Sequence, residues 1–145
     1  MNGPSYRFRL ERVRALRERR EEQAKQSFAE ALEAHERCGR ELRNVQETIV
    51  NARRAQLEAS ADTLGAHQSY LERLERSEQL CRQRLAAYEA SLDEARAALT
   101  KASQELEALE RLKEKGLAEH TREASRLEQL LLDEIAGNGH WRRAA

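Results

Sequence analysis

Between Leu71 and Leu109, apolar residues recur in alternating steps of three and four. A repeat of about 3.5 residues places them on one stripe of an α-helix, as in a coiled coil, whereas a strand needs alternation with period two. Charged residues such as Arg82 and Glu94 flank the stripe, as expected of an exposed helix face. This stretch therefore predicts a helix that buries one narrow seam. The seam positions are Leu71, Leu74, Glu78, Cys81, Leu85, Tyr88, Leu92, Ala95, Leu99, Ala102, Leu106 and Leu109.

A second, less regular seam runs through the first half of the chain. Its members are Phe28, Ala31, His35, Cys38, Leu42, Val45, Ile49 and Ala52, preceded by Leu10, Val13 and Leu16. The pattern lapses between Ser60 and Gln68, where Gly65 favours a turn, and Ser69 with Glu72 predicts a capping box. We expect one coiled-coil domain over residues 1–145, with a helix at about 5–60, a turn at about 61–68, a helix at about 69–136 and a flexible tail at 137–145.

The composition requires the two seams to bury each other. Aromatic residues make up only 4% of the 145 residues and charged residues 36%, too little apolar surface for a rounded core. Isolated helices of this polarity are marginal in water. The predicted fold class is therefore all-α, a long antiparallel two-helix coiled-coil hairpin. One continuous helix that dimerises is the alternative, and the lapse near Gly65 argues against it.

Pairing about residue 65 sets the predicted register. It brings Leu42 close to Tyr88 and Leu16 close to Glu114. Cys38 and Cys81 are then offset by roughly ten residues, or about 15 Å along the helices. We therefore expect no disulfide between them.

The sequence contains no pattern typical of an enzyme. It has no glycine-rich phosphate loop, no paired histidine ligands, and no serine or cysteine with an evident base, so we expect no catalytic, cofactor-binding or metal-binding residues. Basic and acidic residues number 26 each, which argues against attraction to nucleic acid. There is neither a secretion signal nor an apolar run long enough to enter a membrane, so we expect a cytoplasmic protein.

Two local features suggest binding surfaces. The amino end is basic, either as a solvated helix face paired with glutamates or as an electropositive tip for an acidic protein surface, with nucleic acid the least favoured partner. Near the other end, Leu127, Leu130, Leu131, Leu132 and Ile135 lie beyond the reach of the first helix. They either bind a partner or cover the amino-terminal segment or a second copy. The arginines are Arg7, Arg9, Arg12, Arg14, Arg17, Arg19 and Arg20.

Both ends resemble the flagellar export protein family FliJ. The opening Phe8-Arg9-Leu10-Glu11-Arg12-Val13, with Leu16-Arg17, Glu21-Glu22 and Ala24, is similar to the start of that family, and Leu109 to Lys115, Glu128 and Leu132 to Ala136 are similar to its end. The resemblance implies an antiparallel hairpin like the central stalk of rotary ATPases. It also implies contacts with a hexameric ATPase at Phe8, Leu10, Val13, Leu16, Leu130, Leu131, Asp133, Glu134 and Ile135. We add Arg12 and Arg17 to these candidates as rim charges.

The resulting hypothesis is a non-enzymatic stalk. Its partners would be the hexameric type III export ATPase and the cytoplasmic part of the export-gate membrane protein, with export chaperones as further candidates. We expect a monomeric hairpin located in the cytoplasm, peripheral to the inner-membrane export apparatus. The alternatives are the equivalent stalk of a virulence injectisome, a structural homodimeric coiled coil, and a rod that binds nucleic acid through its arginines.

Overall fold

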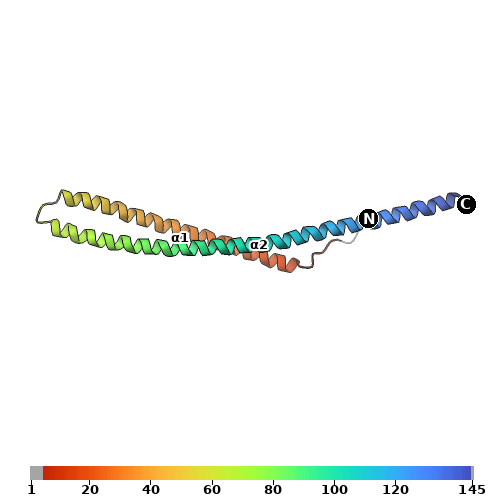
Figure 1. Ribbon diagram of the computed structural model, residues 1–145, viewed down its shortest axis with the longest axis horizontal. Helices are drawn as coiled ribbons and strands as arrows, with labels where there is room; N and C mark the ends of the chain where they lie inside the picture. Colours follow the sequence, from red (N-terminus) through yellow and green to blue (C-terminus); the bar gives the residue numbers. More distant parts are fainter. Residues whose placement is uncertain (1–4, 145) are drawn as a thin grey trace. The chain divides into compact units, whose positions relative to one another are not determined.

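The computed structural model describes residues 5–144, and two helices account for most of them (Figure 1). Helix α1 spans Glu11–Leu57 and helix α2 spans Leu64–Ala144, with a short connection at residues 58–63. No strand occurs among residues 5–144. The helices run antiparallel and pack against each other, which confirms the predicted all-α hairpin.

The chain divides into two compact units. Glu22–Lys101 forms one, here called the hairpin unit, and the terminal unit combines the chain up to Glu21 with the chain from Ala102 onward. Each unit contains a segment of α1 and a segment of α2. The expectation of a single domain stays a prediction.

Packing in the hairpin unit follows the predicted seams. Its buried apolar residues are Cys38, Ile49, Ala52, Leu71, Cys81 and Leu92, all of them seam positions. Ile49, Ala52 and Leu71 form a cluster against which Val45 and Leu74 pack. Intervening residues are mostly exposed, because a pair of helices can remove only one stripe of each from water.

The connection is shorter than predicted and lies earlier in the chain. Thr63 donates its backbone N–H to the Ser60 carbonyl at 3.1 Å, and its own carbonyl accepts the His67 N–H at 3.1 Å, which starts α2. The predicted turn at 61–68 and helix start at residue 69 are therefore wrong. Ser69 and Glu72 lie inside α2 and form no cap, since the Ser60–Thr63 turn already supplies the reversal.

The register differs from the prediction for the same reason. Gln56 donates to Gln68 at 3.0 Å and Gln46 to Glu78 at 3.4 Å, and the midpoint of each pair is residue 62 instead of 65. Tyr88 consequently lies beside Cys38, with which it lines a hollow that does not include Leu42.

The register also overturns the argument about the two cysteines. The Cys38 Sγ atom lies 3.9 Å from the carbonyl oxygen of Cys81, so the predicted offset of about ten residues is wrong. Both thiols are free in the structure, although they lie closer together than the predicted register placed them.

The ends of the helices differ from the prediction as well. Residues 5–10 precede α1 and are not helical, whereas α2 continues through Gly137 and Gly139 to Ala144. The predicted helix end at Ala136 and the flexible tail are therefore not found, although Ala145 lies outside the described residues. A glycine inside a helix costs about 1 kcal/mol relative to alanine, which weakens a helix without ending it. No described glycine has a positive φ, so none forms a left-handed helix cap.

Candidate functional site

The first turns of α1 face α2 with charged residues instead of leucines. Glu11, Arg14 and Arg17 are half-buried in the terminal unit. Arg17 forms an ion pair with Glu105, and the Lys113 Nζ atom lies 3.2 Å from the Glu11 Oε2 atom. These pairs flank the start of the seam, where Leu106 of α2 is buried.

Leu10, Val13 and Leu16 are not part of the buried seam. Their exposed fractions are 37%, 40% and 47%, so the prediction that they continue the seam is wrong. The physical reason is the helical repeat: steps of four and three backward from Phe28 reach Arg17 and then Arg14, so Leu16 and Val13 fall beside the seam. Leu10 precedes α1. Val13 and Leu16 of α1, with Leu10 just before the helix, therefore form an exposed apolar stripe, here called the α1 stripe. All three are candidate partner-binding residues.

Ion pairing fixes the charge state of Glu11. Its carboxylate accepts hydrogen bonds from Arg14 Nη2 at 2.8 Å and Arg14 Nε at 3.0 Å, which, together with Lys113, lower the pKa of Glu11 to about 2. Arg14 also contacts Glu18 at 3.3 Å. Arg14 is therefore paired with glutamates of its own helix, which is one of the two interpretations of the basic amino end. Arg17 is paired with Glu105 of α2, whereas Arg12 is exposed.

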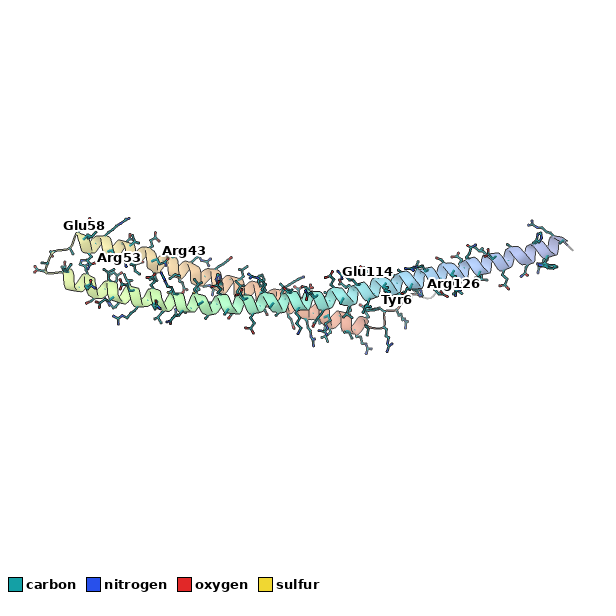
Figure 2. All side chains as sticks on the ribbon, viewed as in Figure 1. Tyr6, Arg43, Arg53, Glu58, Glu114 and Arg126 are labelled. Carbon is teal, nitrogen blue, oxygen red and sulfur yellow. The ribbon has the colours of Figure 1, made fainter. Side chains whose placement is uncertain are left out.

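The segment before α1 packs on α2 through Tyr6. The rings of Tyr6 and His120 are 5.6 Å apart between centroids and tilted by 43°. A Cβ atom at Gly116 would collide with the Tyr6 hydroxyl, so a glycine is needed for this close approach. In Figure 2, Tyr6 lies beside the part of α2 that carries Glu114. Phe8 is half-buried, and its carbonyl accepts the Glu11 N–H at 3.1 Å.

Beyond His120, α2 is uncovered within the terminal unit. Every residue from 121 to 144 is exposed except the partly buried Gly139, and Arg126 projects from this stretch in Figure 2. The large apolar side chains remain between half and two thirds exposed at Leu127, Leu130, Leu131, Leu132 and Ile135. We call these five residues the leucine face. Asp133 and Glu134 border it, with Asp133 accepting a hydrogen bond from Gln129 at 3.2 Å.

Trp141 extends the leucine face and was not predicted to do so. It is 78% exposed and helical. It follows Leu130 by 11 residues, close to three turns of 3.6, so the two side chains share one side of α2. Trp141 could not be recognised from the sequence because the glycines at 137 and 139 predicted a flexible tail there.

The structure does not bring the two sets of candidate residues together. Lys113 of α2 is level with Glu11 of α1, and Leu130 follows Lys113 by 17 residues, or about 25 Å along the helix. The α1 stripe and the leucine face are therefore separate surfaces of the terminal unit. A partner that contacts both must span that distance.

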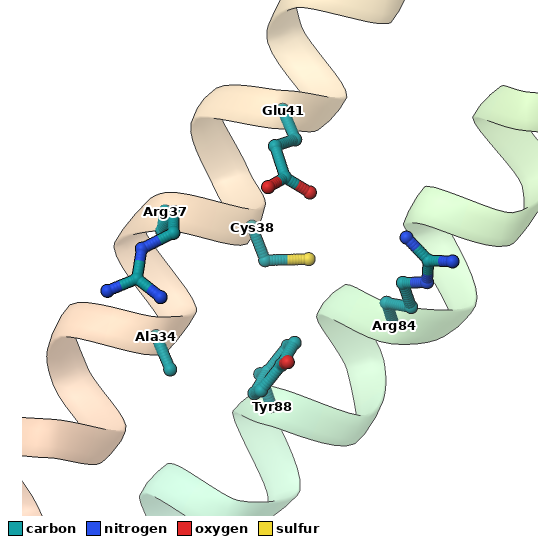
Figure 3. Close-up of a pocket in the computed structure, with 6 residues that line it drawn as sticks. All are labelled: Ala34, Arg37, Cys38, Glu41, Arg84 and Tyr88. Carbon is teal, nitrogen blue, oxygen red and sulfur yellow. The ribbon is translucent and has the colours of Figure 1, made fainter.

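A hollow of about 220 Å³ opens on the hairpin unit (Figure 3). Six residues from both helices line it, namely Ala34, Arg37, Cys38, Glu41, Arg84 and Tyr88. Residues 5–144 contain no group of three or more histidine, cysteine or carboxylate side chains that could hold a metal ion. Nor does either helix, within that range, include a stretch long and apolar enough to cross a bilayer.

The fold and its exposed surfaces define an all-α protein, an antiparallel two-helix coiled-coil hairpin whose second helix carries an uncovered apolar face. A comparison with protein families identifies the family to which the chain belongs. The chain belongs to the FliJ family, whose description is "Flagellar FliJ protein", and the family match covers residues 6–145. Membership connects the chain with flagellar protein export. Comparisons with curated proteins and with solved structures found no match.

Proposed function

We propose that this protein is a non-enzymatic stalk of flagellar type III export, which binds the hexameric export ATPase and links it to the export gate. Family membership supports the export role, and the leucine face carries the binding proposal. An apolar face this exposed on a helix favours association with another surface. The proposed location is the cytoplasm, peripheral to the inner-membrane export apparatus, with the gate's cytoplasmic part and export chaperones as further partners.

The two surfaces would contribute differently to ATPase binding. Burying Leu130, Leu131 and Ile135 would set the lifetime of the complex, since buried apolar contacts mainly control dissociation. Arg12 is exposed at the rim and would mainly speed association with an acidic surface. Arg17 is a weaker candidate because Glu105 already neutralises it. The exposed Leu10, Val13 and Leu16 would add a second contact.

Binding kinetics with the purified export ATPase of the same cell would test the proposal. Leu130→Ser with Leu131→Ser should raise the dissociation rate at least tenfold while leaving the helix content unchanged, because both side chains are already exposed. Val50→Ser with Leu80→Ser is the matched control, since these residues of the hairpin unit are 47% and 55% exposed. Equal binding by both double variants and the unmodified chain would refute the proposed docking face.

A homodimeric scaffold is the second candidate, and the same leucine face favours it. Two copies could cover each other's leucines without any ATPase. Sedimentation equilibrium distinguishes the two candidates. The stalk proposal expects a monomer in the micromolar range that the leucine variant leaves unchanged. A stable dimer that dissociates when Leu130 and Leu131 are replaced would favour the scaffold.

An injectisome stalk would instead bind a virulence export ATPase in preference to the flagellar one.

A further inference from the structure

Two buried cysteines lie close to each other in the seam of the hairpin unit. Cys38 of α1 is 3% exposed and Cys81 of α2 is 7% exposed. The Cys38 Sγ atom lies 3.9 Å from the carbonyl oxygen of Cys81, so the thiol of one cysteine contacts the backbone of the other. A disulfide requires the two backbones to approach within the span of two short side chains, and the Cys38 thiol already touches the backbone of Cys81.

The hollow beside Tyr88 gives Cys38 a route to solvent. Cys38 lines it together with Arg84 of α2 (Figure 3). A volume of about 220 Å³ admits a molecule as small as a peroxide, although the cysteine itself is almost wholly buried. Burial raises the pKa of the Cys38 thiol, and the Glu41 carboxylate and Cys81 raise it further, whereas the Arg84 guanidinium acts in the opposite direction.

We propose that Cys38 and Cys81 are a covalent modification site, a dithiol that hydrogen peroxide converts reversibly into a disulfide staple between α1 and α2. The Cys38 thiolate attacks one peroxide oxygen and the O–O bond breaks, which leaves a sulfenic acid and a hydroxide that takes up a proton. The Cys81 thiolate then attacks the sulfenic sulfur, forms the S–S bond and displaces a second hydroxide, which is also protonated. In total, two thiols and one peroxide yield one disulfide and two waters.

The staple would hold α1 and α2 in one register. The two cysteines are 43 residues apart in sequence, so the bond closes a long loop and restricts the unfolded chain. Thermal melting of the hairpin unit should shift upward by roughly 10 °C on oxidation. A thiol reductant such as dithiothreitol should reverse the shift.

Mass spectrometry of the full chain tests the proposal. The reduced protein is treated with hydrogen peroxide, residual thiols are alkylated, and the monomer is digested. A linked peptide pair containing Cys38 and Cys81 is expected, and its rate of formation should rise by up to about tenfold per pH unit below the thiol pKa. Cys81→Ser should abolish both the link and the melting shift.

A matched control keeps two thiols on the same seam. Cys81→Ser combined with Leu71→Cys moves the second thiol ten residues, about 15 Å along α2 and farther from the level of Cys38, and should not link to Cys38. Circular dichroism checks that this variant is still helical, and Cys81→Ser alone provides the reference should it unfold. The proposal is overturned if the native cysteines link only between two chains, if they oxidise singly without linking, or if the control pair links equally fast.

Discussion

Replacing Leu92 by alanine should destabilise the hairpin unit more than the same change at Leu80. Both residues lie on α2 in that unit, but Leu92 is 6% exposed and Leu80 is 55% exposed. The substitution removes three carbon atoms, each contributing about 0.8 kcal/mol when fully buried. Scaling by burial predicts a loss of about 2.3 kcal/mol at Leu92 and about 1 kcal/mol at Leu80. Helix propensity changes little in either case, because alanine and leucine are both good helix formers.

Urea denaturation followed by circular dichroism measures both losses. Comparing two leucines of one helix cancels most effects on the unfolded chain. Arg84→Ala, on the exposed side of α2, should cost less than about 0.5 kcal/mol and serves as the baseline. If the two leucine variants lost equal stability within about 0.5 kcal/mol, the seam would not be the source of stability and the packing argument would fail.

Three further predictions concern the terminal unit. Acid should loosen the start of α1, because ion pairing lowers the pKa of Glu11 to about 2. The contribution of Glu11 to stability is therefore present above its ordinary pKa of 4.5 and is lost as the pH falls from there towards 2. Glu11→Gln should remove that dependence in melts recorded across this range, and an unchanged acid profile would contradict it. Gly116→Ala should displace Tyr6, which would raise hydrogen exchange at residues 5–10. The alanine should also add up to about 1 kcal/mol of helix propensity, so the melting temperature should stay unchanged or rise. Unchanged protection of residues 5–10 would refute the predicted clash. Arg17→Glu should lower stability and Arg17→Glu with Glu105→Arg should restore most of it, whereas equal losses would show that the ion pair contributes nothing.

The local part of the fold was predictable from the sequence. Spacing by three and four from Leu71 to Leu109 depends only on the helical repeat, and the structure buries Leu71, Cys81, Leu92 and Leu106 accordingly. The uncovered leucine face was also predictable, because no apolar partner positions remain in the first half of the chain. The resemblance at both ends agreed with the family match.

The register and the outward-facing surfaces depended on the tertiary structure. A shift of the turn by a few residues costs little in any local pattern, yet it moves every pair across the seam. For this reason the register predicted from the sequence placed Cys38 and Cys81 about ten residues apart along the hairpin, whereas they are in contact in the structure. Likewise, the pairing of Arg17 with Glu105, a residue 88 positions away, could not be read from the local pattern. Helical periodicity is encoded within a few residues, whereas pairing across the hairpin is decided only when two distant segments pack.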